Sequence, residues 1–105
     1  MREDIAASGF TAAIVGHVGD GNFHTVILVP KDDPEALAGA WELDRKIVAR
    51  ALALGGSCSG EHGVGLGKRE FLPREHGGEA LAVMRAIKTA LDPRGIMNPG
   101  KMFLD

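Results

Sequence analysis

Two apolar, β-branched runs, residues 12–18 and 22–30, flank the pair Asp20-Gly21. An Asp-Gly pair between such runs is typical of a β-hairpin with a two-residue type I′ turn. This turn would place His17 opposite His24, with their Cβ atoms roughly 4.5–5.5 Å apart on one face of the sheet. The pattern therefore predicts a hairpin that brings two imidazoles together.

The apolar residues after the hairpin follow helical spacing. Asp33 is a good N-cap, Pro34 suits the first helical position, and the helical spacing continues down to Gly55-Gly56. We expect one helix of roughly 20 residues here, near the upper end of the usual length. It should pack Trp41 and Ile47 against the sheet.

Three further segments have helical character. Residues 2–8 are good helix formers that end at Gly9. Residues 68–75 predict a short helix interrupted at Pro73, because proline removes a backbone donor. Residues 79–91 carry apolar side chains at offsets of three and four, which indicates an amphipathic helix.

These elements predict an α+β fold, with an antiparallel sheet that includes the hairpin over residues 11–30 and is backed by helices. Two strands alone do not form a stable sheet in water. We therefore expect an oligomer or a larger domain to supply further strands.

Composition fits a globular domain, or part of one, of 105 residues with 45% hydrophobic and 25% charged side chains. The net charge of −2 and the absence of a basic run predict no nucleic-acid partner. The only cysteine, Cys58, cannot form an internal disulfide, and no apolar run reaches the ~20 residues that span a bilayer. These features favour a cytoplasmic protein.

Glycines cluster at 16–21, 55–67 and 77–78, and glycine allows backbone to approach a ligand closely. The long glycine-rich loop carries Glu61, which we predict to be the third ligand of a divalent metal site with His17 and His24. Two imidazoles and one carboxylate leave a coordination position open for substrate or water. They suit zinc, manganese or iron without selecting one. The alternative is a polar pair of histidines on the sheet surface.

His62 follows Glu61 directly and admits several roles. It could be a fourth ligand, or it could hydrogen-bond to backbone. Because imidazoles titrate near neutral pH, it could also be a general base. The residues alone do not choose between these roles.

Three segments together closely resemble a known family: residues 16–24 (GHVGDGNFH), 59–65 (SGEHGVG) and 98–101 (NPGK). The resemblance is to the C-terminal part of FAD-linked 2-hydroxyacid dehydrogenases, from about residue 10 to residue 103, and it is strongest to the D-lactate branch. It implies that the metal ligands are His17, His24 and Glu61. It also implies that His62 contacts substrate and is the catalytic base, and that the turn at Asn98 lies near the flavin.

The resemblance implies a function for the whole assembly. Residues 1–105 would be the C-terminal portion of a cap, or substrate, domain, and the FAD-binding domain would be absent from them. The reaction implied is FAD- and metal-dependent oxidation of a small D-2-hydroxy acid, D-lactate to pyruvate, with the isolated chain inactive. Val26 stands where the 2-hydroxyglutarate branch has a substrate-binding Asn, which favours a monocarboxylate.

Two alternatives remain, a glycolate oxidase subunit and a non-enzymatic metal-binding or interaction module. The partners implied by the enzyme interpretation are an FAD-binding domain or chain, which would hold most of the FAD, and a cytochrome or quinone-type electron acceptor. A homo-oligomer is a further expectation. The location expected is cytoplasmic, or peripheral to the inner membrane.

Overall fold

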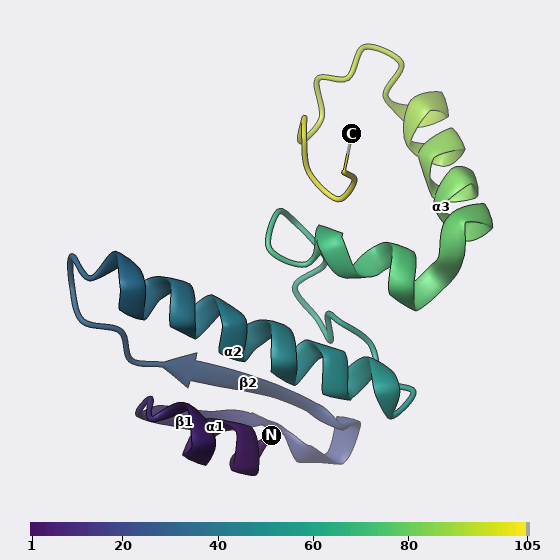
Figure 1. Cartoon of the computed structure of the whole chain (residues 1–105). Coiled ribbons are helices and arrows are strands. Elements are labelled where there is room, and N and C mark those ends of the chain that lie inside the picture. Colours follow the sequence, from purple (N-terminus) through teal and green to yellow (C-terminus); the bar gives the residue numbers. More distant parts are fainter. Residues whose placement is uncertain (105) are drawn as a thin grey trace. The chain divides into compact units, whose positions relative to one another are not determined.

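The structure is a computed structural model that describes residues 1–104, and it divides into two compact units at the junction between Gly60 and Glu61 (Figure 1). The helices and strands of the first unit are α1 (Arg2–Ser8), β1 (Ala12–His17), β2 (Asn22–Ile27) and α2 (Pro34–Ala53). The second unit holds α3 (Leu72–Leu91). Two short 3₁₀ segments complete the described elements, η1 (Val18–Asp20) and η2 (Arg69–Phe71). The predicted α+β class with an antiparallel hairpin is confirmed.

The hairpin has a different register from the predicted one. His17 lies opposite Asn22, and Val15 lies opposite His24, so the predicted His17–His24 pairing is wrong. A type I′ turn needs positive φ at both central residues, and Asp20 does not adopt it. Instead η1 forms a wider loop, in which the Gly21 amide donates to the Val18 carbonyl at 3.1 Å.

Both strands are shorter than predicted. The strand predicted over residues 12–18 ends at His17, because Val18 already belongs to the loop. The strand predicted over residues 22–30 ends at Ile27, although the Leu28 amide still donates to the Thr11 carbonyl at 2.9 Å. Each strand of the hairpin is thus six residues long, and one additional backbone hydrogen bond joins the two chain segments at the open end.

The two helices of the first unit begin and end where the sequence predicts. α1 stops at Gly9, which is left-handed with φ of 75°. α2 has Asp33 as its N-cap, whose Oδ1 accepts from the Ala36 amide at 2.9 Å. This bond satisfies a backbone donor that would otherwise be left without a helical partner.

One face of α2 forms most of the core of the first unit, and its buried side chains are Ala40, Leu43, Ile47 and Val48. Of the two side chains predicted to pack against the sheet, Ile47 is buried, whereas Trp41 is 49% exposed and lies outside the core. Each helical residue is rotated about 100° from the last. Trp41 therefore lies beside the buried stripe and not within it.

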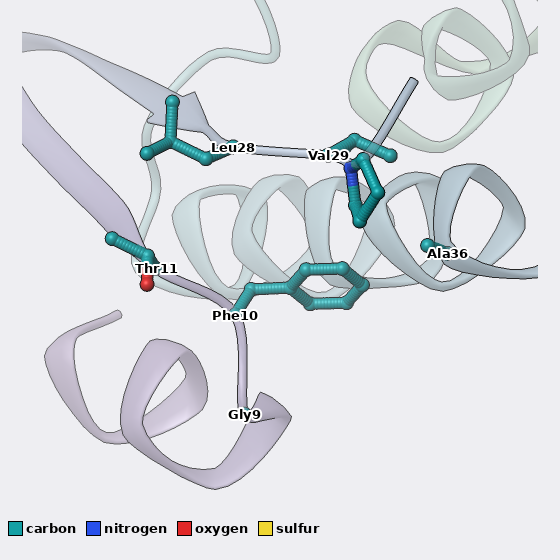
Figure 2. Close-up of a pocket in the computed structure, with 7 residues that line it drawn as sticks. Gly9, Phe10, Thr11, Leu28, Val29 and Ala36 are labelled. Carbon is teal, nitrogen blue, oxygen red and sulfur yellow. The ribbon is translucent and has the colours of Figure 1, made fainter. Parts of the chain in front are cut away.

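The segment that joins α1 to β1 packs towards α2. Figure 2 shows Phe10 directed towards this helix from between Gly9 and Thr11. A Cβ placed on Gly39 of α2 would lie 3.1 Å from the Phe10 ring, so the two groups are in close contact. The open pocket drawn there is lined by Gly9, Phe10, Thr11, Leu28, Val29, Pro30 and Ala36.

In the second unit, α3 consists of two helical stretches that meet at a kink, in agreement with the separate helices predicted over 68–75 and 79–91, although the first stretch begins only at Leu72. Pro73 lies in the first turn of this helix, so the prediction that it interrupts a helix is wrong. Proline is tolerated there because its missing N–H would have no helical acceptor. The kink lies at Gly77, between the two predicted helices, where φ is 78° and ψ is 168°.

Asp92 directly after α3 organises the chain that follows the helix. Its carboxylate is buried, forms an ion pair with Lys88, and accepts hydrogen bonds from the amides of Ile96 and Met97 at 3.0 Å each. The Lys88 ammonium and, after it, these amides lower the pKa of Asp92.

Among the described residues, no helix is long and apolar enough to cross a membrane.

Candidate metal centre

The hairpin places two imidazoles on the same face of the sheet. His24 lies opposite Val15, and His17 is two residues further along β1. Since side chains alternate between faces, His17 and His24 are diagonal neighbours on one face. Their ring centroids are 6.3 Å apart, with an angle of 86° between the ring planes.

Gly16 permits a very close approach of the two strands beside these rings. A Cβ at this position would lie 2.4 Å from the Asn22 carbonyl oxygen and 2.5 Å from the Phe23 Cα. Both are backbone atoms, so they cannot move aside as the end of a flexible side chain could. The hairpin therefore requires glycine at residue 16, a constraint that the sequence indicated only as part of a glycine cluster.

Glu61 is joined directly to Gly60, the last residue of the first unit. His17, His24 and Glu61 each offer one ligand atom, and these three atoms lie within 4.8 Å of one another. His17 and Glu61 are exposed, and His24 is half-buried.

The donor set fits a divalent cation. Two imidazole nitrogens and one carboxylate oxygen are a common set for zinc, with bonds of about 2.0–2.2 Å. Ligands bound to one tetrahedral ion with such bonds lie roughly 3.4 Å apart. The observed separations extend to 4.8 Å, so the three side chains would move closer together to bind one ion.

His62 lies beside the carboxylate of this set. Its Nε2 is 3.0 Å from Glu61 Oε1, and the side chain is 79% exposed. The carboxylate can thus orient the imidazole, while the ring remains accessible to a bound molecule. This geometry is compatible with proton transfer to or from a small ligand.

Asn98 lies in the second unit, in a turn closed by a hydrogen bond from the Lys101 amide to the Asn98 carbonyl at 3.2 Å. Its φ of 47° is left-handed, a conformation that asparagine adopts more readily than most residues. The turn is held from η2, because the Arg69 guanidinium donates to the Gly100 carbonyl at 2.9 Å. A contact between Asn98 and flavin stays a prediction.

Residues 1–102 match the family described as FAD linked oxidases, C-terminal domain. The chain belongs to this family. It is 49% identical over 102 residues to a D-lactate dehydrogenase [cytochrome] 1, mitochondrial, of Saccharomyces cerevisiae, covering 97% of this chain and 17% of the relative. A probable mitochondrial D-lactate dehydrogenase of Danio rerio is 45% identical over 102 residues, covering 97% of this chain and 20% of the relative.

A glycolate oxidase subunit GlcD of Bacillus subtilis is also similar, at 42% identity over 104 residues, covering 95% of this chain and 22% of the relative. The predicted family is confirmed by these matches. The chain spans about a fifth of the length of these curated relatives.

Proposed function

We propose that this chain contributes the metal centre and the catalytic base to an FAD- and metal-dependent dehydrogenase of D-2-hydroxy acids. The observation that carries the proposal is the convergence of His17, His24 and Glu61 in a chain that belongs to the FAD linked oxidase family. The substrate proposed is D-lactate and the product pyruvate, in keeping with the names of the relatives.

The residues divide the work of oxidising an alcohol. A divalent cation held by the three ligands, zinc, manganese or iron, would stabilise negative charge developing on the substrate hydroxyl oxygen. His62 binds the substrate and accepts the hydroxyl proton through its imidazole, and Glu61 orients that ring. FAD supplies the hydride acceptor.

A separate domain or chain would bring most of the FAD-binding surface, with Asn98 contributing near the flavin. On this proposal the isolated chain does not turn over, because it holds the base but not the hydride acceptor. A cytochrome or quinone-type electron acceptor would be a further partner of the complete enzyme. Homo-oligomer formation is compatible with the exposed sheet.

The surroundings of His24 favour a small monocarboxylate. Val15, its partner across the strands, and Val26, two residues further along β2, share its face and are 54% and 51% exposed. An apolar surface beside the ligands suits the methyl group of lactate and provides no partner for a second carboxylate. Glycolate, which lacks the methyl group, is the second candidate, favoured by the similarity to a glycolate oxidase subunit.

The metal centre is tested by metal retention. We expect His17→Ala and His24→Ala each to abolish Zn²⁺ retention after dialysis, measured by elemental analysis of the purified chain. His76→Ala is the matched control, since His76 lies within α3, where its Nε2 is 3.6 Å from Glu75 Oε1, and is not one of the proposed ligands. If both hairpin variants keep the metal, the proposed centre is wrong. If the chain binds metal but no flavin reduction occurs once a flavin-binding partner is supplied, the non-enzymatic metal-binding module is favoured.

A further inference from the structure

Asn22 shares its face of the hairpin with the two imidazoles. It lies opposite His17 in the strand pairing, and opposed residues direct their side chains to the same face. His24 is two residues further along β2 and therefore lies on that face too. The Asn22 side chain is half-buried, so its position is restricted by neighbouring atoms.

Gly60 packs directly on the Asn22 amide. A Cβ at Gly60 would lie 2.3 Å from Asn22 Oδ1, 2.8 Å from Cγ and 3.4 Å from Nδ2. Contacts shorter than 3.0 Å are far inside van der Waals separation, so no side chain fits at residue 60 while Asn22 keeps its place. Cys58, two residues earlier in the same loop, is buried.

Space, and not backbone conformation, explains the glycine at this position. Gly63 and Gly65 in the same loop have φ of 74° and 53° and no atom within 4 Å of an added Cβ, so they are needed for their left-handed backbone. Gly60 has no such φ and has the crowded neighbour instead. Its small size therefore serves the contact with Asn22.

We infer that Asn22 is a positioning residue for the metal centre, because it seats Gly60 and thereby holds Glu61 next to His17 and His24. Consecutive Cα atoms are about 3.8 Å apart, so fixing Gly60 against the imidazole face confines the start of the Glu61 side chain to that face. This inference rests on the proposed metal centre. It adds a reason why Glu61, which lies in a loop distant in sequence, is found beside the hairpin: the contact between Asn22 and Gly60.

The test is a double-mutant cycle read by Co²⁺ titration of the full chain, following both the dissociation constant and the visible absorption bands, which depend on ligand number and geometry. We expect Gly60→Ala and Asn22→Ala each to raise the dissociation constant about 10–100-fold, as losses of supporting residues around metal ligands do. In the Asn22→Ala background, adding Gly60→Ala should cost less than about threefold, because the atoms that the new methyl group would meet are gone. Gly67→Ala is the matched control, since a Cβ there meets nothing within 4 Å.

The outcomes separate this inference from the proposed function. If His17→Ala and His24→Ala lose Co²⁺ while Gly60→Ala and Asn22→Ala keep the affinity and bands of the unaltered chain, only the positioning role is wrong. Equal, additive losses in the cycle would also overturn it. If the histidine variants still bind Co²⁺, the proposed centre is wrong and the inference falls with it. Far-ultraviolet circular dichroism checks folding, and Asn22→Ala alone carries the test should Gly60→Ala not fold.

Discussion

At the scale of single residues, the proposed metal centre depends on small side chains as much as on its proposed ligands. Imidazoles and carboxylates can reach one ion only if the backbone segments that carry them come close. Gly16 allows the two strands to come close, and Gly60 allows the loop to come close to β2. In both places the free volume of a missing side chain is filled by the neighbouring group, so substitution acts on the site without touching a ligand.

Gly16→Ala should separate the strands beside the two histidines. Its methyl group would lie 2.4 Å from a backbone oxygen, so we expect an overpacking cost of roughly 1–3 kcal/mol in the free energy of unfolding, measured by urea denaturation. Co²⁺ affinity should fall as well, because His17 is the next residue. Gly19→Ala, where an added Cβ meets nothing within 4 Å, should leave the metal affinity within experimental error. Equal behaviour of the two variants would refute the close-approach argument.

At the scale of elements, the junction after α3 depends on a carboxylate whose charge is stabilised by the fold. The Lys88 ammonium and the amides of Met97 and Ile96 lower the pKa of Asp92 below its ordinary value near 3.9. A depressed folded-state pKa adds stability that is present above the unfolded-state value and is lost as the pH falls through the folded-state value. The affected range therefore lies below about pH 4.

Asp92→Asn should lower the urea midpoint at pH 7 relative to the unaltered chain. Below about pH 4, the Asp92 carboxylate of the unaltered chain becomes protonated, so the difference in midpoint between the two proteins should shrink progressively. Urea midpoints of both proteins across this range measure the effect. Glu79→Gln, an exposed charge removal on the same helix, is the control and should shift the midpoint little. A difference between Asp92 and its amide variant that stays constant down to pH 2 would contradict the proposed role of the charge.

The elements also show what sequence patterns can predict. α2 has its N-cap, proline and apolar stripe within one continuous segment, and its bounds follow from them. The hairpin was predicted with His17 opposite residue 24 and is observed with residue 22 opposite, a slip of two residues. Side chains alternate with a period of two, so this slip leaves both imidazoles on the predicted face.

Features that depend on distant residues were not predictable from local patterns. Asn22 and Gly60 are 38 positions apart (60 − 22), and no periodicity links a strand to an irregular loop. The start of α3 at Leu72 was also missed, because the sequence alone does not reveal that a helix begins beside Pro73. The exposure of Trp41 depends on which stripe of α2 the first unit buries.

At the scale of the whole molecule, many large apolar side chains remain exposed. They occur in both units, and the most exposed are Val18, Leu54, Leu91 and Ile96. A two-stranded sheet gains little stability by itself. Together with a match to about a fifth of each relative's length, this exposure leads us to expect that the chain works as part of a larger assembly.

The isolated chain, supplied with FAD, Zn²⁺ and D-lactate, should show no flavin reduction by absorbance. A chimera tests the rest: residues 1–102 replace the matching C-terminal segment of the Saccharomyces cerevisiae relative, to which they are 49% identical. We expect the chimera to oxidise D-lactate with a higher kcat/KM than glycolate, because a methyl group in an apolar site contributes about 1–3 kcal/mol, or 10–200-fold. His62→Gln in the chimera should lower kcat by about 10²–10⁴-fold, the usual contribution of a general base.

The controls for the chimera distinguish the two substrates and the two classes of function. Val26→Asn should reduce the preference for D-lactate over glycolate without lowering flavin content, since it removes apolar surface beside His24 and leaves the ligands unchanged. A preference for glycolate in the unaltered chimera would favour the oxidase-subunit alternative. A folded chimera with full flavin and metal content that oxidises neither acid would refute the proposed enzyme, because positioning, metal and hydride acceptor would then all be present without the reaction.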